Sequence, residues 1–340
     1  MRAAVLQAPE KVAFADVPRP ERDTGEAVIR VTHSGICGTD LKIFQGGIPV
    51  QYPRIMGHES VGDVVEAGTG VKTGGPVIID PVRVCGQCYV CQAQQSHLCP
   101  VGGLIGRDID GGFADYVRAP AQNLYPLPDQ VDPAVAPLIQ PLTTCLHGVR
   151  RAQIFPGEAV VVLGLGVTGL MHVQLAKAHG AHPVIAITRS EWKRELAERL
   201  GADYSLPPDE HAVDRVLEIT NGHGADLVIE SAGKVSVLSL AVELARIGGR
   251  ILPFGIYTEG EGALPFYQFY FKELAIINTR AAKAEDYTGS IDLVQRGIVD
   301  LKPLISHGFP LDEIGQALDL LDGSESGRMK IIFDHGSTTE

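Results

Sequence analysis

The chain has 340 residues, and at roughly 150 residues per domain this length predicts two domains. Apolar residues make up 45% and charged residues 21%, a balance typical of folded globular proteins and not of disordered ones. The net charge of −12 disfavours nucleic acid and anionic membranes as partners, because both would repel the chain. No apolar run reaches the roughly 18 residues that span a bilayer, and the first residues lack the apolar core of a signal peptide, so we expect a cytoplasmic protein.

The predicted elements change in kind near residue 150. Before it, residues 27–31 and, less clearly, residues 61–65 mix apolar with polar types in the manner of half-buried strands, which predicts antiparallel β-structure. After it, apolar strands alternate with helix-length patterns; the strands cover residues 159–163, 184–187, 227–229, 251–254 and 274–277. Such strands are typical of a parallel sheet covered on both faces. We therefore predict an α/β fold in which a doubly wound parallel sheet follows a mostly β domain.

Four cysteines lie within residues 85–99, with the spacing C-x2-C-x2-C-x7-C. They are Cys85, Cys88, Cys91 and Cys99. A reducing cytoplasm disfavours disulfides, so clustered cysteines there indicate metal ligands first. Short spacings let one loop surround Zn²⁺ with four thiolates, which leaves no position for water and makes the site structural. An iron–sulfur cluster is the main alternative, because similar spacings serve it.

A glycine-rich loop follows the first apolar strand of the second half. Gly164, Gly166 and Gly169 form G-x-G-x-x-G, with Val167 and Thr168 between the last two. The three glycines serve a tight turn, the approach of a pyrophosphate, and helix–strand packing, in that order. The start of the following helix supplies free N–H groups for phosphates. The loop therefore predicts dinucleotide binding.

The residues after the second strand of the sheet favour NADP over NAD. An acidic residue there would bind the 2′-hydroxyl of an NAD ribose, but Thr188 occupies that place and Arg189, Ser190 and Lys193 follow. Hydroxyls and basic groups hold a 2′-phosphate, whereas a carboxylate repels it. The alternative is an NAD site in which Arg189 stacks on the adenine and Glu191 provides the carboxylate.

A second set of zinc-ligand residue types precedes the cysteine cluster. Cys37, His58 and Glu59 offer a thiolate, an imidazole and a carboxylate. The surrounding segment meets the pattern G-H-E-x2-G-x5-G-x2-V, in which Gly57, Gly62, Gly68 and Val71 are the remaining fixed residues. With the cysteine cluster and the nucleotide loop, these segments resemble the zinc-containing alcohol dehydrogenases of the medium-chain dehydrogenase/reductase superfamily. The resemblance covers essentially the whole chain and is nearest to the polyol, threonine and glucose dehydrogenase branch.

The resemblance implies a division of the chain into a catalytic and a nucleotide domain. It implies a GroES-like catalytic domain over residues 1–150, which carries the zinc lobe at 85–99 and is completed by residues 281–340. A Rossmann domain over residues 151–280 lies between, and substrate and nicotinamide would meet in the cleft between the two. The family forms dimers or tetramers, which implies a homo-oligomer.

The resemblance also assigns roles within the catalytic site. Cys37 and His58 match constant zinc ligands, and Glu59 matches a carboxylate that either ligates the metal or sits just behind it. A further carboxylate of the family is replaced here by Gln140, a neutral and weaker ligand, and this substitution slightly favours a sugar substrate. In the same segment, Thr144 is expected to contact the cofactor.

The family's proton path is altered in this sequence. The motif C-G-T-D-L-H reads C-G-T-D-L-K here, so Thr39 keeps the hydroxyl that touches the substrate oxygen, while Lys42 replaces the histidine that passes the proton outward. A lysine is a poor relay near neutral pH unless it is desolvated. The proton then leaves through water, or the pKa of Lys42 is lowered.

The predicted protein is an oxidoreductase with two zinc ions per chain. It transfers a hydride between a secondary alcohol, polyol or sugar and NADP, or NAD. The alternatives are a zinc-dependent reductase of aldehydes or ketones, an NAD-dependent polyol dehydrogenase, a zinc-free reductase of the same superfamily, and a zinc-finger binding module, which the acidic charge disfavours.

Overall fold

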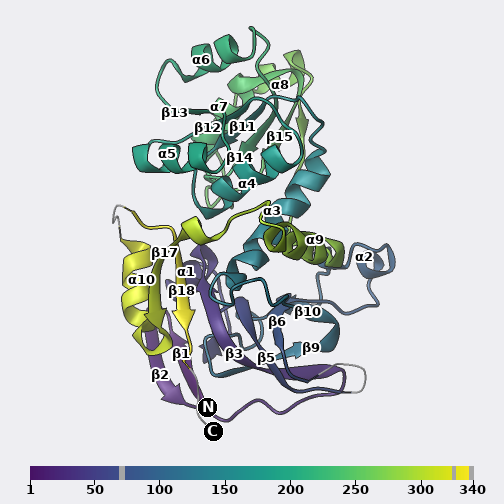
Figure 1. Ribbon diagram of the computed structural model, residues 1–340, viewed down its shortest axis with the longest axis vertical. Coiled ribbons are helices and arrows are strands. Elements are labelled where there is room, and N and C mark those ends of the chain that lie inside the picture. The colour runs from purple at the N-terminus through teal and green to yellow at the C-terminus, as the bar shows by residue number, and fades with distance from the viewer. Residues whose placement is uncertain (69–72, 324–326, 337–340) are drawn as a thin grey trace. The chain divides into compact units, whose positions relative to one another are not determined.

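The structure is a computed structural model that describes residues 1–68, 73–323 and 327–336 (Figure 1). Contacts within the chain divide it into two compact units. The first contains Met1–Pro141, Lys283–Gln295 and Leu301–Glu340, and the second contains Leu142–Ala282 and Arg296–Asp300. The domain boundary that we expected at residue 150 lies within one continuous helix, α3 (Ile139–Ala152), and the contacts divide the chain earlier in this helix, after Pro141.

The return of Arg296–Asp300 to the second unit was not predicted from the sequence. The side chain of Gln174 donates a hydrogen bond to the carbonyl of Asp300 (3.0 Å) and accepts one from its N–H (2.7 Å). A long-range pair of bonds between one side chain and one backbone unit leaves no periodic signal in a sequence.

The first unit is built mainly from antiparallel strands. Its largest sheet has the order β10-β6-β5-β3-β18-β17, and β9 also pairs with β3. The strands are β3 (Glu26–Ile36), β5 (Glu59–Glu66), β6 (Pro76–Ile79), β9 (Tyr116–Pro120), β10 (Leu124–Pro126), β17 (Ile305–Pro310) and β18 (Lys330–Asp334). The β3–β5 pair confirms the antiparallel structure predicted for residues 27–31 and 61–65. Gly62 lies where β3 passes so closely that a Cβ atom would stand 2.0 Å from the Arg30 carbonyl oxygen.

The remaining elements of the first unit are shorter. A second sheet has the order β2 (Lys11–Asp16), β1 (Arg2–Ala8) and β4 (Arg54–Ile55), and β7 (Val82–Arg83) pairs with β8 (Gly103–Leu104). The helices are α1 (Gly38–Phe44), α2 (Tyr89–Gln92), α9 (Ala284–Gln295) and α10 (Ile314–Asp322), and the 3₁₀ turns are η1 (Ser96–Leu98), η2 (Ala121–Asn123), η3 (Ala136–Leu138), η4 (Lys302–Leu304) and η5 (Leu311–Glu313). One apolar core, which includes Leu6, Ile43, Met56, Phe113 and Phe333, packs β1, α1 and β18 together.

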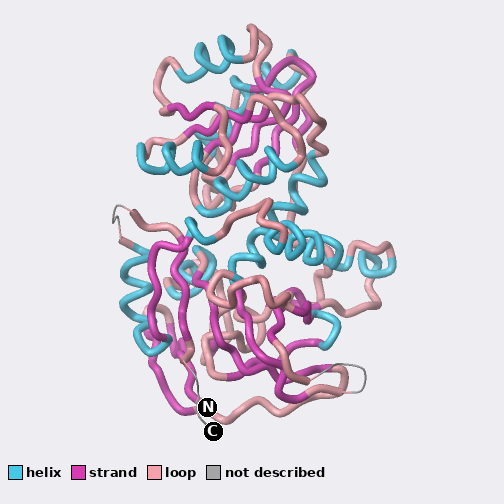
Figure 2. The backbone as a smooth tube through the Cα atoms, in the orientation of Figure 1, coloured by secondary structure: helices cyan, strands magenta, loops and turns pink. Residues whose placement is uncertain are grey.

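The second unit is a parallel sheet flanked by helices (Figure 2). Its strand order is β13-β12-β11-β14-β15-β16, and all of its paired strands are parallel. The strands are β11 (Val160–Leu163), β12 (Val184–Ile187), β13 (Tyr204–Leu206), β14 (Ala225–Glu230), β15 (Ala245–Pro253) and β16 (Ala275–Ile276). Besides α3, the helices are α4 (Val167–Ala178), α5 (Glu191–Arg199), α6 (Ala212–Ile219), α7 (Val235–Leu244) and α8 (Phe266–Phe271). This arrangement confirms the predicted doubly wound sheet.

The strand order places a ligand-binding edge within the second unit. The chain runs outward through β11, β12 and β13, then returns to the other side of β11 for β14, β15 and β16. The order therefore reverses between β11 and β14, and doubly wound sheets bind ligands outside the carboxyl ends of their strands at such a point. Within the described ranges, none of the helices is both long and apolar enough to cross a bilayer.

Candidate active site and metal centres

The junction of β3 and α1 is fixed by the buried carboxylate of Asp40. Its Oδ2 accepts a hydrogen bond from the N–H of Cys37 (2.9 Å), and its Oδ1 accepts one from the N–H of Gly57 (3.3 Å). The same Oδ1 lies 3.3 Å from Nδ1 of His58. One carboxylate thus ties the start of α1 to the turn before β5. Asp40 was not among the predicted site residues, although an acidic residue three places after a helix N-cap is a known capping signal.

The His58 ring is oriented for metal binding through its second nitrogen. Because Nδ1 faces Asp40, Nε2 is left for another partner, an arrangement typical of histidines that ligate zinc. Desolvation lowers the pKa of His58, but Asp40 and Cys37 outweigh it and hold that pKa well above the ordinary value. A ligating histidine must be neutral, so binding a metal here would release a proton.

Cys37, His58 and Glu59 are brought together by the fold. One potential ligand atom from each lies within 4.8 Å of the other two, and His58 and Glu59 are buried. A thiolate, an imidazole and a carboxylate gathered in this way fit Zn²⁺. Of the sequence pattern around them, Val71 lies outside the described residues.

Glu59 is held from behind by a lysine of the last strand. Nζ of Lys330 lies 2.8 Å and 2.6 Å from the two carboxylate oxygens, and it also donates to the Ile36 carbonyl oxygen (3.1 Å). Both side chains are buried, with 5% of Lys330 and 1% of Glu59 exposed. Gly35 lies against this carboxylate, since a Cβ atom there would stand 2.3 Å from Oε2. In this arrangement the Glu59 carboxylate is paired with a buried cation.

Gln140 lies in the first turn of α3 and is buried. Its side chain is a hydrogen-bond partner of Tyr287 on α9. The Tyr287 hydroxyl donates to Oδ1 of Asp80 (3.3 Å), and its ring stacks on that of Tyr125 at 4.5 Å between centroids. Gln140 is therefore part of a polar cluster beneath β6 and β10, which sequence analysis did not foresee.

The two residues of the expected proton path lie on α1. Thr39 is in its first turn, two residues after Cys37, and Lys42 is in its last turn. Both side chains are half-buried. Along the sequence, Thr39 therefore lies closer to Cys37 than Lys42 does.

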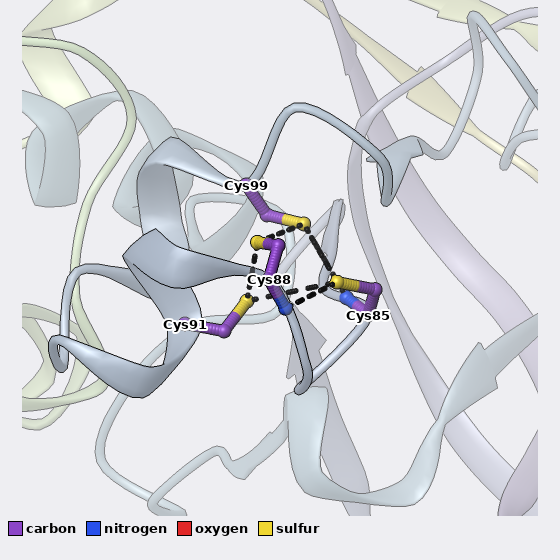
Figure 3. A group of neighbouring side chains, drawn as sticks. All are labelled: Cys85, Cys88, Cys91 and Cys99. Carbon is purple, nitrogen blue, oxygen red and sulfur yellow. Dashed lines mark hydrogen bonds between the residues drawn. The ribbon is translucent and has the colours of Figure 1, made fainter.

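The four clustered cysteines point their sulfur atoms at one another (Figure 3). The Sγ–Sγ distances are 3.4 Å for Cys88–Cys91, 3.6 Å for Cys85–Cys99, 3.8 Å for Cys88–Cys99 and 4.0 Å for Cys85–Cys91. Zinc–sulfur bonds of about 2.3 Å place neighbouring sulfur atoms about 3.8 Å apart in a regular tetrahedron. The spacing therefore fits one four-coordinate ion, and it is too small for a cluster of several irons.

Backbone N–H groups support thiolates in this lobe. The Sγ of Cys99 accepts from the N–H groups of Cys85 (3.4 Å) and Gly102 (3.3 Å), and such donation lowers the pKa of Cys99 to about 6. Desolvation and the neighbouring sulfur of Cys88 raise the pKa of Cys91 to about 12. Four thiolates cannot ionise together at this separation without a cation, because like charges repel. A divalent ion would remove that conflict, so the donor set fits Zn²⁺.

The glycine-rich loop lies at the carboxyl end of β11. Gly164 follows the strand with φ of +86°, a conformation that L side chains rarely adopt, and Gly166 is the N-cap of α4. A Cβ atom on Gly169 would stand 1.9 Å from the Gly164 carbonyl oxygen, whereas one on Gly166 would meet no atom within 4 Å. The third glycine serves packing, and the second leaves its outer side open for a ligand. Val167 and Thr168 open α4, where the first N–H groups have no partner within the helix.

The turn after β12 carries the residues expected to select the cofactor. Thr188 is half-buried, Arg189 is exposed and Ser190 is the N-cap of α5. Arg194 on the next turn of that helix donates to the carbonyl oxygens of Thr188 and Arg189, both at 3.0 Å. This bracing role of Arg194 was not predicted from the sequence.

Two further residues were expected to bind the cofactor: Lys193, which lies on α5, and Thr144, which lies on α3. The Lys193 amine lies 5.2 Å from the centre of the Trp192 ring on α5. Thr144 is half-buried on α3.

Two family matches together cover most of the chain. Residues 23–129 match the alcohol dehydrogenase GroES-like domain, and residues 167–296 match the zinc-binding dehydrogenase family. The first match contains both metal-ligand groups, and the second begins at the glycine-rich loop. The chain belongs to the zinc-containing alcohol dehydrogenases.

Proteins similar to this zinc-type dehydrogenase align with it along nearly its whole length. L-Threonine 3-dehydrogenase of Pyrococcus horikoshii is 37% identical over 94% of this chain and 93% of its own. A candidate zinc-binding dehydrogenase of Sinorhizobium meliloti 1021, bound to NADP, is 33% identical with a TM-score of 0.91 over 98% of both chains. An alcohol dehydrogenase of E. coli CFT073, complexed with NADH, is 29% identical with a TM-score of 0.91 over 98% of this chain and 99% of its own. The protein is accordingly a zinc-dependent alcohol dehydrogenase linked to NAD(P).

Proposed function

We propose that this dehydrogenase transfers a hydride between a secondary alcohol, polyol or sugar and NADP. The observation that carries the proposal is the gathering of Cys37, His58 and Glu59, with the ring of His58 aimed by Asp40. The substrate class rests on the relative from Pyrococcus horikoshii, whose name places the oxidised group at carbon 3 of threonine. The alternatives are reduction of an aldehyde or ketone as the working direction, and a polyol dehydrogenase that uses NAD.

The chain's own residues define how this site would work. Bound zinc would offset negative charge on the substrate oxygen, and a bound nicotinamide would exchange a hydride with the carbinol carbon. Cys37 and His58 would hold the metal, with Asp40 keeping the ring of His58 in place. The Thr39 hydroxyl would accept the substrate's proton, which then leaves past Lys42 or through water. Gln140 would serve as a neutral neighbour or ligand of the metal.

The preference for NADP is supported by the turn after β12. Arg189 is exposed, and no carboxylate occupies position 188. The NADP bound to the Sinorhizobium meliloti relative is in accord with this preference. A guanidinium and two hydroxyls would bind a 2′-phosphate that a carboxylate would repel. The NADH complexed with the relative from E. coli supports the alternative, in which the cofactor is NAD.

A second, structural zinc ion is proposed for the four-cysteine lobe. The sulfur spacing and the N–H donors described above support it. All four cysteines are free of disulfides, which fits a reducing compartment such as the cytoplasm.

We propose that the protein forms a homo-oligomer through the β16 edge of the parallel sheet. Aromatic and aliphatic side chains are exposed there: Phe266 70%, Tyr267 70%, Tyr270 84%, Phe271 55% and Ile276 45%. Within the described chain β16 is the last strand of its sheet, so one side of its backbone is open for pairing. A second copy related by a two-fold axis would offer the same strand and the same apolar residues.

The reaction and its metal requirement are tested together. Secondary alcohols, polyols and aldoses are offered with NADP⁺ and NAD⁺, and the reverse reaction with the matching ketones and aldehydes, while zinc is quantified. We expect turnover of at least one substrate class, faster with NADP⁺, and two zinc ions per chain. Cys37→Ser should lose one zinc ion and the turnover. Turnover that persists in Cys37→Ser at the wild-type rate would contradict the proposed site.

A further inference from the structure

A buried carboxylate joins two loops at the binding edge of the parallel sheet. Glu230 is the last residue of β14 and is fully buried. Its Oε1 accepts from the N–H groups of Ala232 (2.7 Å) and Gly233 (2.9 Å), and its Oε2 accepts from the hydroxyl of Tyr257 (2.5 Å) and again from Gly233 (3.1 Å). Both oxygens of the anion are therefore satisfied by N–H and O–H donors, in the manner that buried charges require.

The same residue also holds the second loop through its backbone. The Glu230 carbonyl oxygen accepts from the N–H groups of Phe254 (2.8 Å) and Gly255 (2.9 Å), which follow β15. A Cβ atom on Gly255 would stand 2.1 Å from the nitrogen of Gly233 and 3.0 Å from Oε2 of Glu230. The two loops thus approach so closely that position 255 has no room for a side chain. Tyr257 then closes the second loop onto the carboxylate from outside.

These loops border the glycine-rich loop on the side away from β12. A Cβ atom on Gly164 would stand 3.0 Å from the backbone nitrogen of Ala232, so residues 231–233 are its immediate neighbours. In a doubly wound sheet the pyrophosphate lies at the glycine-rich loop, and the adenosine ribose lies at the carboxyl end of the second strand, here β12. The other half of the dinucleotide must then extend toward the carboxyl ends of β14 and β15.

We propose that Glu230 and Tyr257 are positioning residues for the nicotinamide half of the cofactor. Glu230 fixes the backbone of Ala232 and Gly233, and Tyr257 fixes residues 254–257 against them. Neither side chain needs to touch the nicotinamide, because the loops they join form the wall beside it. The inference rests on the proposed use of NAD(P) by this unit and adds the residues that shape one end of its site.

The test compares two probes that differ only in the nicotinamide. Dissociation constants are measured for NADPH and for 2′-phospho-ADP-ribose, which keeps the phosphates and both riboses but has no nicotinamide ring. Tyr257→Phe removes only the hydroxyl that reaches Glu230. We expect it to weaken NADPH binding about 10- to 150-fold, the equivalent of one hydrogen bond to a charged group, and to change 2′-phospho-ADP-ribose binding less than twofold. Tyr204→Phe, which removes an exposed hydroxyl on the opposite edge strand β13 of the same unit, is the matched control and should change neither constant.

A second variant probes the carboxylate itself. Glu230→Gln keeps the size of the side chain but turns an NH₂ group toward N–H or O–H donors, and we expect a larger loss for NADPH with the same selectivity. Should this variant fail to fold, Tyr257→Phe still decides the matter. NADPH binding unchanged in Tyr257→Phe, or equal losses for both probes, would overturn the inference. Failure of the unaltered protein to bind either probe would instead overturn the proposed cofactor.

Discussion

The partner of Glu59 illustrates what a single residue contributes to the site. Lys330 neutralises a carboxylate that lies directly beside His58, and both charges are out of water. Burial of two ions is costly, but removal of only one of them is worse, because the other is left without compensation. The pair therefore fixes the position of the Glu59 carboxylate. It thereby limits the space around the candidate catalytic metal.

We predict that Lys330→Met destabilises the protein by about 3–5 kcal/mol, since it leaves Glu59 buried and unpaired. The free energy of unfolding is measured by urea denaturation with zinc present. Lys330→Arg keeps the positive charge and should lose much less. A Lys330→Met variant as stable as the unaltered protein would show that Glu59 finds another partner.

Asp80 makes a contrasting case, because its burial is unfavourable to the ionised form. Desolvation raises the pKa of Asp80 from 3.8 to about 6, although the N–H of Val82 and the hydroxyl of Tyr287 act in the opposite direction. The folded state therefore binds more protons than the unfolded state between these two values. Stability falls as the pH rises through that window and stays reduced above it. A shift of this size corresponds to at most about 3 kcal/mol, less for a side chain that keeps some contact with water.

We predict that Asp80→Asn gains stability over the unaltered protein at pH 7.5, by about 1–3 kcal/mol, and gains none near pH 4. Urea denaturation of both proteins at several pH values gives this difference directly. Asp129→Asn, at an exposed position, is the control and should show no such trend. An Asp80→Asn gain that is independent of pH would contradict the assignment.

The candidate ligand residues could be predicted from the sequence, but the residues that hold them in place could not. Cys37, His58 and Glu59 were expected because their types and local pattern are characteristic. Lys330 is separated from Glu59 by 271 positions, and no local pattern connects them. Glu230 and Tyr257 were missed for a similar reason, because an acidic residue at the end of an apolar strand gives no sign of the loop that it will bind.

Among the elements, the turn between β12 and α5 has the clearest consequence for function. Arg194 braces its two carbonyl groups, so the exposed side chain of Arg189 starts from a fixed backbone. A preorganised guanidinium loses less entropy when it binds a phosphate than one on a mobile loop.

We predict that Arg189→Ala weakens NADPH binding at least tenfold and NADH binding less than threefold, because only NADPH carries the 2′-phosphate. Fluorescence titration with both cofactors measures the two losses. Arg199→Ala, an exposed position at the end of the same helix, should affect neither. Equal losses for both cofactors would mean that Arg189 contacts a part common to them.

The cysteine lobe is an element whose order we propose to depend on a bound zinc ion. Only α2, η1 and the β7–β8 pair provide regular structure there, so little else orders the segment. A structural zinc ion contributes directly to folding free energy.

We predict that Cys91→Ser contains one zinc ion fewer per chain and melts several degrees lower, while the remaining folded protein still transfers hydride. Metal analysis and thermal unfolding provide the readout. Gln92→Ala, the next residue on α2, should retain both ions and the melting temperature. Loss of turnover in a Cys91→Ser protein that stays fully folded would place this ion in the chemistry.

Elements were predictable where their patterns were long. The apolar run predicted at 159–163 contains β11, and the run at 184–187 coincides with β12, since strands buried on both faces must be apolar throughout. The edge strand β13 was not foreseen, because it has three residues and is partly exposed. The domain boundary was expected at residue 150, within helix α3, because the change in strand type marks the start of the parallel sheet and not the helix that leads into it.

For the whole molecule, net charge and the apolar β16 edge act in opposite directions. A charge of −12 keeps copies apart in general, so association must come from a specific surface. The exposed aromatic residues of α8 are the surface that we propose for it.

We predict that Tyr270→Glu shifts the protein toward the monomer, because it would bury a carboxylate in the contact. Light scattering coupled to size-exclusion chromatography measures the mass. Tyr204→Glu, at the opposite edge strand β13, should keep the mass of the unaltered protein. An unaltered mass in Tyr270→Glu would exclude this edge as the interface.

The order of the chain has a consequence for how the protein is made. Strand β18 lies between β3 and β17 in the sheet, yet it follows the residues of the parallel-sheet unit in the sequence. A ribosome will have released nearly the entire parallel-sheet unit before the first unit can receive its missing strand and the lysine it carries. The buried pair of Glu59 and Lys330 therefore forms only after the residues of the parallel-sheet unit have been synthesised, and until then Glu59 lacks its cation.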